Sequence, residues 1–287
     1  MKQPDVENLE IDLLLEGIRD CYGYDFRGYA RASLKRRLIH RMQQMSLNHL
    51  SEMIPRILYN RELLGQLLKD MSITVTEMFR DPPFFRAVRE TIVPVLKTYP
   101  FIKIWHAGCA TGEEVYSMAI LLKEEGIYNK TQIYATDFNN EALHVAKEGI
   151  YPISKIKKST LNYNKSNGKG CLSDYYHVKY TAAKIDNSLK KQILFANHNL
   201  VTDGVFNEMH LIVCRNVLIY FGKELQNQVL SLFCQSLCHR GYLCLGSKET
   251  LTLSDIEEQF ETIHKPERIF RKNDSFSPAC FVEVNST

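Results

Sequence analysis

The first part of the chain carries hydrophobic residues at helical spacing and lacks strong strand-like runs. Apolar positions recur every three or four residues in several segments, a pattern that predicts amphipathic helices. The composition then changes to the β-branched stretch 72–76, and Asp81-Pro82-Pro83 breaks the chain before a further helical pattern at 83–97. We therefore predict a small helical domain over residues 1–75 and a second domain over 76–287. The predicted helices of the first domain are residues 8–20, 28–45, 47–58 and 61–70.

The second domain alternates between short apolar runs and amphipathic stretches. Regular alternation of this kind predicts an α/β fold, a mainly parallel, doubly wound sheet covered by helices on both faces. Ligands of such sheets bind at the carboxyl ends of the strands. The predicted strands are residues 101–107, 131–137, 192–198, 209–214 and 241–247, and the predicted helices are residues 113–125, 140–148 and 223–238.

Two further segments do not follow this alternation. Residues 151–190 contain the turn-rich polar stretch 162–170, followed by the strand-like residues 175–180, so we expect a small antiparallel β insertion there. Near the carboxyl terminus, residues 267–272 are predicted to form an edge strand.

The turn between the first predicted strand and its helix contains two glycines, Gly108 and Gly112. Glycine permits positive φ and close approach of a ligand to the backbone, and the helix start adds favourable amide dipoles. The second predicted strand ends in Asp137, 25 residues beyond Gly112, near the spacing at which doubly wound folds place an acid for ribose hydroxyls. The alternatives are an ordinary glycine turn and a helix N-cap role for Asp137, a role that Asn139 or Asn140 could share.

Composition narrows the class of protein. Of the 287 residues, 45% are apolar and 24% charged, which is typical of globular proteins, and no run approaches the ~18 apolar residues of a membrane span. The polar amino terminus lacks a signal-peptide core, so we expect a cytoplasmic protein. The eight cysteines include no CxxC pair, and we expect no metal site.

The net charge of +3 is too small to indicate a nucleic-acid-binding protein by itself, but the basic residues are concentrated. Residues 26–51 contain no Asp or Glu. On the predicted helix 28–45, the basic side chains flank an apolar stripe and would point outward. This face is either a docking surface for an acidic partner or an ordinary solvated surface. The candidate partner-binding residues are Arg31, Lys35, Arg37 and Arg41.

Five motifs, in this order along the chain, resemble the CheR family of chemotaxis protein-glutamate methyltransferases. They are Thr74-Val75-Thr76-Glu77-Met78-Phe79-Arg80, Ala110-Thr111-Gly112-Glu113-Glu114-Val115-Tyr116-Ser117, Ala135-Thr136-Asp137, Asn199-Leu200 and Cys214-Arg215-Asn216-Val217-Leu218-Ile219-Tyr220-Phe221. The resemblance covers nearly the whole chain. It implies a Rossmann-like methyltransferase sheet and methylation of glutamates on the cytoplasmic helical bundles of chemoreceptors. S-adenosylmethionine would be the methyl donor and S-adenosylhomocysteine the product.

The resemblance also implies a role for each matching residue. Glu114 would bind the methionyl end of the cofactor, Asp137 the ribose, and Asn199 with Leu200 the adenosine region. Arg80 would contact the cofactor and the reacting centre, and Tyr220 would lie beside the methyl group. The remaining predicted cofactor-binding residues are Thr74, Thr76, Gly108, Arg215 and Asn216. At position 74 the family often has asparagine, so that contact is the least supported.

Other interpretations of these residues remain open. Glu114 could be a helix-start acid, Arg80 an interdomain salt bridge, and Tyr220 a core residue. A dehydrogenase would also have glycine turns and a terminal acid, but the Gly-X-X-X-Gly turn and the lack of a hydride-transfer domain argue against it. A nucleic-acid methyltransferase lacks support because no base-flipping motif is present. The remaining alternative is a non-catalytic adaptor that senses S-adenosylmethionine or S-adenosylhomocysteine and docks on receptors.

Overall fold

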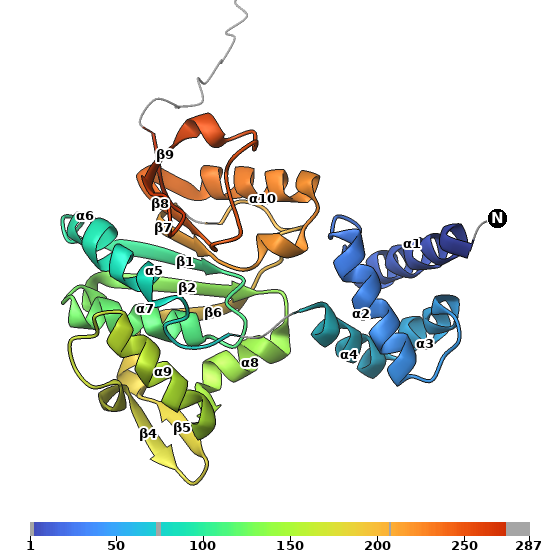
Figure 1. The fold of residues 1–287 in the computed structure, drawn as a ribbon, viewed down its shortest axis with the longest axis horizontal. Coiled ribbons are helices and arrows are strands. Elements are labelled where there is room, and N and C mark those ends of the chain that lie inside the picture. Colours follow the sequence, from blue (N-terminus) through green and yellow to red (C-terminus); the bar gives the residue numbers. More distant parts are fainter. Residues whose placement is uncertain (1–2, 73–75, 207, 274–287) are drawn as a thin grey trace, which may run out of the picture.

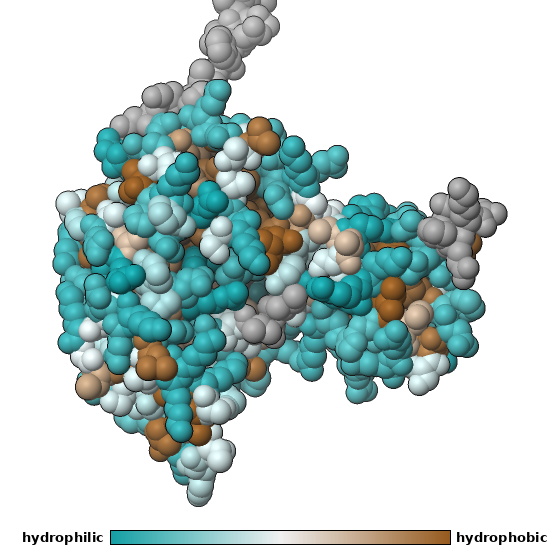
Figure 2. Space-filling model, in the orientation of Figure 1, coloured by the Kyte–Doolittle hydropathy of each residue, from teal (hydrophilic) through white to brown (hydrophobic). Residues whose placement is uncertain are grey.

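A computed structural model of the protein describes residues 3–72, 76–206 and 208–273. The described chain forms two lobes, one entirely helical and a larger one built on a sheet (Figure 1). Within these residues, no helix combines the length and the apolar character needed to cross a membrane. The face in Figure 2 is largely hydrophilic, with hydrophobic side chains in scattered patches.

The helical lobe buries one apolar stripe from each of its helices. Its core contains Leu14 and Ile18 from the first helix, Leu38 from the second and Ile57 and Leu67 from the last two. The helical segments predicted from the sequence are confirmed, although a short 3₁₀ turn over Leu50–Glu52 precedes the third helix. The helices are α1 (Gln3–Tyr22), α2 (Arg31–Gln44), α3 (Met53–Tyr59) and α4 (Arg61–Met71).

The second lobe contains, in the described residues, a seven-stranded sheet with the order β6-β2-β1-β7-β8-β10-β9. The strands β6, β2, β1, β7 and β8 run parallel to one another. The strand β10 pairs antiparallel with both β8 and β9. The chain moves outward from β1 through β2 to β6 and then returns to the other side of β1, so the switch point lies between β1 and β7. The strands are β1 (Ile102–Ala107), β2 (Thr131–Asp137), β6 (Ile193–Asn197), β7 (Met209–Cys214), β8 (Leu237–Leu245), β9 (Phe260–His264) and β10 (Ile269–Lys272).

Helices cover both faces of this sheet, as the alternating pattern predicts. Because side chains alternate along a strand, Ile104 of β1 joins the core under one layer of helices, and its neighbour Trp105 joins the core under α10. The covering helices are α5 (Pro82–Ala87), α6 (Val93–Leu96), α7 (Glu113–Glu124), α8 (Asn140–Glu148) and α10 (Lys223–Ser236). Residues Val88–Ile92 form a π-helical turn between α5 and α6.

The predicted insertion is a three-stranded antiparallel sheet with the order β3-β5-β4. The turn-rich expectation for residues 162–170 is wrong in its first part, because a helix, α9, continues to Lys165. This helix is rich in Lys, Ser and Asn, and its buried positions are Ile156, Ser159 and Tyr163, so the apolar signal is weak although the spacing is helical. The insertion consists of β3 (Ile150–Pro152), α9 (Ile153–Lys165), β4 (Tyr176–Lys179) and β5 (Ala182–Ile185).

Two details of the predicted sheet are corrected. The strand near residues 267–272 is β10, but it lies between β8 and β9 and is not an edge. The edge strand on this side of the sheet is β9, which the sequence pattern did not reveal. In addition, β8 begins at Leu237, directly after α10, and not at residue 241. The division expected after residue 75 adjoins residues 73–75, outside the described part, and stays a prediction.

Candidate functional site

One pocket lies at the carboxyl ends of β1, β2 and β7, where the helical lobe meets the sheet lobe. It contains about 970 Å³ of empty space, part of which is open to solvent. Its position is the switch point of the sheet, where doubly wound folds bind ligands. Thr74 lies outside the described residues. The other predicted site residues all line this pocket: Thr76, Arg80, Gly108, Glu114, Asp137, Asn199, Leu200, Arg215, Asn216 and Tyr220.

The glycine turn after β1 brings the backbone to the pocket. Gly108 has φ of +76°, and a Cβ there would lie 2.5 Å from Cγ2 of Val217. Gly112 has φ of +89°, and a Cβ there would lie 2.9 Å from Cβ of Ala146. Both positions therefore require glycine for conformation and for space. Ala110, between them, also has positive φ, of 48°.

Asp137 ends β2 and is almost buried, with 8% of its surface exposed. Its Oδ2 accepts the amide of Ala110 and its Oδ1 accepts the amide of Asn139, both at 2.9 Å. Burial raises the pKa of Asp137 even though these amides favour the ionised form. The cap of α8 is the side chain of Asn139, which accepts the amides of Glu141 and Ala142. Asp137 therefore serves the glycine turn and the pocket and not the helix start.

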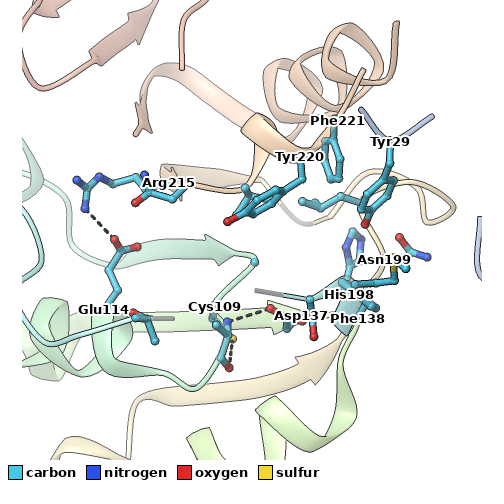
Figure 3. Close-up of a pocket in the computed structure, with 18 of the residues that line it drawn as sticks. Tyr29, Cys109, Glu114, Asp137, Phe138, His198, Asn199, Arg215, Tyr220 and Phe221 are labelled. Atoms are coloured by element: carbon cyan, nitrogen blue, oxygen red, sulfur yellow. Dashed lines mark hydrogen bonds and ion pairs between the residues drawn. The ribbon is translucent and has the colours of Figure 1, made fainter. Parts of the chain in front are cut away.

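Glu114 stands at the other end of the pocket, in a charged cluster (Figure 3). Arg215 donates from Nη1 to Glu114 at 2.9 Å and from Nη2 to Asp81 at 2.8 Å. Nδ1 of His106 lies 3.3 Å from the second oxygen of Glu114. Burial opposes ionisation, but His106 and the charge of Arg215 lower the pKa of Glu114. The arrangement keeps a carboxylate anion at this end of the pocket.

The segment around Arg80 has an unusual backbone. Phe79 and Asp81, on either side of Arg80, have φ of 52° and 56°. Such left-handed conformations cost roughly 1–3 kcal/mol each in residues other than glycine and persist only where packing enforces them. The ring of Phe79 is fully buried against Phe85 and Tyr163, with centroids 5.0 and 5.1 Å away. Arg80, between Phe79 and Asp81, lines the pocket.

Tyr220 ends a 3₁₀ turn over Leu218–Tyr220, and its ring points into the pocket (Figure 3). The guanidinium of Arg37, from α2, lies 4.7 Å from the ring centroid. Burial raises the pKa of Tyr220, although the charges of Arg37 and Arg80 act in the opposite direction. Tyr220 is therefore a neutral phenol beside two cations, and it is more than a core residue.

Sequence reasoning missed Glu249, which organises the turn that carries these residues. The side chain is buried, and its oxygens accept the backbone amides of Asn216 at 3.1 Å and Val217 at 2.8 Å. The same carboxylate also accepts the amide of Gly246. Asn216 has φ of 61°, so the turn is another strained segment held by its surroundings. An isolated Glu in a polar loop gives no signal of this role.

Sequence reasoning also missed Tyr29, which the helical lobe contributes to the pocket. It lies in the loop before α2, and its ring contacts Phe221 with a centroid distance of 5.0 Å. The sequence pattern placed Tyr29 inside the predicted helix 28–45, whereas α2 begins at Arg31, and this pattern carries no information about the pocket. The site therefore includes residues from both lobes.

The basic residues of α2 do not all face solvent. Arg37 is 7% exposed, donates to the carbonyl oxygen of Met71 and lies against Tyr220. Arg41 donates to Asp70 and to the side-chain oxygen of Gln66. The expectation that these two guanidinium groups point outward is wrong, because α2 packs against α4 and the sheet lobe on this side. A docking role for them stays a prediction.

The other two predicted docking residues remain at the surface. Arg31 forms an ion pair with Asp12 at 2.6 Å, and Lys35 pairs with Glu7, both acids on α1. Exposed pairs of this kind contribute little to stability and can exchange partners. Arg36, between Lys35 and Arg37, is exposed. A docking role for Arg31 and Lys35 stays a prediction.

The pocket suits the chemistry of S-adenosylmethionine. Each oxygen of Asp137 accepts one backbone amide and retains lone pairs for ribose hydroxyls, and Glu114 is an anion suited to an ammonium group. His198 also lines the pocket, and its buried Nδ1 has no hydrogen-bond partner among the described residues. Within the same residues, no three His, Cys, Asp or Glu side chains gather as a metal-binding group.

Comparison with known proteins assigns the chain to a family. Residues 9–72 match the model of the CheR methyltransferase all-alpha domain, and residues 74–269 match that of the CheR methyltransferase SAM binding domain. A Pseudomonas putida protein named as a methyltransferase, Cher3, is 50% identical over 93% of this chain and 97% of its own length. The chemotaxis protein methyltransferase of Vibrio anguillarum is 30% identical over 80% of this chain and 84% of its own.

Among solved structures, magnesium protoporphyrin IX methyltransferase from Synechocystis with bound SAM has 13% identity and a TM-score of 0.34, over 66% of this chain and 77% of its own. The two domain matches account for both lobes in the order in which the chain presents them. The chain therefore belongs to the CheR family of SAM-dependent methyltransferases.

Proposed function

We propose that this protein methylates glutamate side chains on the cytoplasmic helical bundles of chemoreceptors, forming glutamate methyl esters and S-adenosylhomocysteine in the cytoplasm. Several relatives are named chemotaxis protein methyltransferases, which supports a protein of the chemotaxis system as the acceptor. The observation that carries the proposal is the positive charge around Tyr220, where Arg80 lines the pocket and Arg37 lies over the ring. Cations at this position attract a carboxylate and repel a protonated amine, so they favour an anionic acceptor.

The proposed cofactor placement follows the polar ends of the pocket. Asp137 would hold the ribose hydroxyls, Asn199 and Leu200 the adenosine region, and Glu114 the ammonium group. Arg215 would keep Glu114 in place, since it already donates to that carboxylate. Thr76, Gly108 and Asn216 would complete the cofactor wall. When bound, S-adenosylmethionine supplies an electrophilic methyl group on a positively charged sulfur.

The protein has to position and desolvate the acceptor. A glutamate with a reference pKa near ~4.3 is already ionised at neutral pH, so no general base is needed. Arg80 would orient the carboxylate with its planar guanidinium, and Tyr220, a neutral phenol, would exclude water beside it. Preorganised side chains of this kind lower the barrier because they need little rearrangement during the reaction. The strained backbone around Arg80 serves this preorganisation.

The direct test is transfer of a labelled methyl group to purified receptor cytoplasmic fragments. We expect incorporation that base treatment releases, as for a methyl ester, and that disappears when the acceptor glutamates are replaced by alanine. Binding of S-adenosylhomocysteine without any transfer would contradict the proposal and support a non-catalytic adaptor.

Replacing Arg80 by alanine tests its proposed role at the acceptor. We expect Arg80→Ala to lower kcat by roughly tenfold or more, because the carboxylate loses a charged hydrogen-bond partner, with a smaller loss of S-adenosylhomocysteine affinity. Arg86→Ala is the matched control, since Arg86 is exposed on α5. An unchanged kcat in Arg80→Ala would remove Arg80 from the reaction.

A further inference from the structure

The helical lobe is joined to the Tyr220 turn by backbone hydrogen bonds. Ala30 donates its amide to the carbonyl of Tyr220 at 2.9 Å, and Gly222 donates to the carbonyl of Gly28 at 2.7 Å. These bonds form an antiparallel bridge between Tyr29 and Phe221. A Cβ at Gly222 would lie 3.0 Å from the oxygen of Gly28, so a side chain there would disturb the approach. The loop before α2 is therefore fixed against the pocket.

This pairing directs the side chain of Tyr29 into the nucleoside end of the pocket. Its ring stacks edge to face on Phe26 and Phe221, with centroids 5.1 and 5.0 Å away. In Figure 3 the hydroxyl points toward the row formed by Asp137, Phe138 and His198. Burial and the charge of Asp137 raise the pKa of Tyr29, so the hydroxyl is protonated. Among the described residues this hydroxyl has no hydrogen-bond partner.

A second polar group at the same end also lacks a partner. His198 is 8% exposed, its ring packs edge to face on Trp105, and its Nε2 lies 3.3 Å from the carbonyl of Gly204. The buried Nδ1 has no partner in the described part of the chain. Buried polar groups usually find partners, so the unpaired Nδ1 of His198 indicates that a ligand completes its hydrogen bonds, and the partly exposed Tyr29 lines the same end of the pocket.

We propose that Tyr29 binds the ribose of the methyl donor through its hydroxyl, opposite Asp137, so that the helical lobe supplies part of the donor site. This inference rests on the proposed function, because it takes a nucleoside as the ligand. A phenol hydroxyl both donates and accepts hydrogen bonds. It can therefore donate to a ribose hydroxyl that itself donates a hydrogen bond to the carboxylate of Asp137. Because Tyr29 and Phe221 pair through the backbone, donor binding also strengthens the contact between the lobes.

The test compares two ligands that share the nucleoside end. Calorimetry would measure the affinity of S-adenosylhomocysteine and of methylthioadenosine, which lacks the amino-acid end. We expect Tyr29→Phe to weaken both ligands by the same factor, roughly threefold to tenfold, the effect of one lost hydrogen bond. Glu114→Gln should weaken only S-adenosylhomocysteine. Tyr59→Phe is the matched control, because Tyr59 is 91% exposed in the same lobe, and it should bind both ligands normally.

Hydrogen exchange measures the link between the lobes. In the wild-type protein, S-adenosylhomocysteine should slow exchange of the amides of Ala30 and Gly222, and Tyr29→Phe should reduce this protection. Wild-type affinities in Tyr29→Phe, with a wild-type protein that binds S-adenosylhomocysteine, would overturn the inference and leave the proposed function standing. A wild-type protein that binds neither ligand would overturn both.

Discussion

Glu249 places one buried carboxylate beneath the turn that carries Tyr220. Burial raises its pKa in spite of the amides of Gly246, Asn216 and Val217 that favour the anion. Because the folded protein binds this proton more tightly than the unfolded chain, the stability contribution of Glu249 is complete below its unfolded pKa and is lost as the pH rises through its folded pKa. The carboxylate is therefore costly at neutral pH, which indicates that it is retained for positioning.

We expect Glu249→Gln to lower kcat by roughly tenfold, because an amide nitrogen cannot accept from the backbone amides and the turn loses part of its support. The wild-type kcat should also fall on acidification through the pKa of Glu249, and this limb should be absent in the variant. Receptor methylation and calorimetry with S-adenosylhomocysteine would separate kcat from donor affinity. In the control Glu257→Gln, a carboxylate that accepts the amide of Leu253 is changed at an exposed position, the start of the 3₁₀ turn Glu257–Gln259. A wild-type kcat in Glu249→Gln would contradict the positioning role.

At the scale of single residues, the sequence identified those whose role is carried by a local motif. Gly108 follows one predicted strand and Asp137 ends another, so the edge on which they lie was foreseeable. Glu249 and Tyr29 reach the pocket from distant parts of the chain, and no local pattern records such contacts. The positive φ of Ala110 is equally hidden, because it depends on the surrounding packing and not on the residue type.

At the scale of elements, the hydrophobic pattern of α2 predicted only one of the two sides on which this helix packs. The apolar stripe predicted the helix and its face toward the helical core, with Leu34 and Leu38 buried. It did not predict that the same helix has a second packed side, where Arg37 lies between Met71 and Tyr220. Arginine stems cover apolar surface while the head group finds polar partners, so a basic face can be an internal contact.

A cluster of charged side chains connects the end of α7 with the segment around α6 and with the insertion, and it predicts how stability depends on pH. Glu125, at the end of α7, pairs with Arg89 at 3.0 Å, Lys97 at 3.1 Å and Lys169 of the insertion at 2.7 Å. Although burial acts in the opposite direction, these cations lower the pKa of Glu125 to about 2. The stabilisation is therefore present above the unfolded pKa of about 4.5 and is lost as the pH falls toward about 2.

Glu125→Gln should lower the free energy of unfolding by about 1–2 kcal/mol at pH 7, after allowance for solvent screening. The difference from wild type should shrink as the pH falls from about 4.5 toward about 2, because the unfolded wild-type chain takes up the proton first and the folded carboxylate becomes neutral only near pH 2. Denaturant unfolding at several pH values would measure it, with Glu90→Gln as a control at an exposed position nearby. A difference that is independent of pH would show that packing, and not charge, is what the variant loses.

At the scale of the whole molecule, the two lobes share one wall. The loop before α2 pairs with the Tyr220 turn, and Asn139 donates to Ser72 at 2.6 Å. The exposed side of α2 lies next to these contacts. A groove beside it is lined by Arg36, Arg37, His40 and Asp70, whose carboxylate is paired with Arg41. An acidic receptor helix lying there would be next to Tyr220, so docking and acceptor placement would use the same surface.

The docking surface should be tested at Arg36, because reversing Arg37 or Arg41 would disturb packing inside the protein. We expect Arg36→Glu to lower kcat/KM for receptor fragments roughly tenfold at low salt, since a like charge then meets the acidic partner. The loss should shrink near about 0.3 M salt, where screening shortens the range of the interaction, and S-adenosylhomocysteine affinity should not change. Arg56→Glu reverses an exposed charge on α3 of the same lobe and is the matched control. Only a specific contact at α2 would make Arg36→Glu more harmful than Arg56→Glu. An equal loss of kcat/KM in both variants, or a loss that salt does not reduce, would therefore show that receptors bind elsewhere.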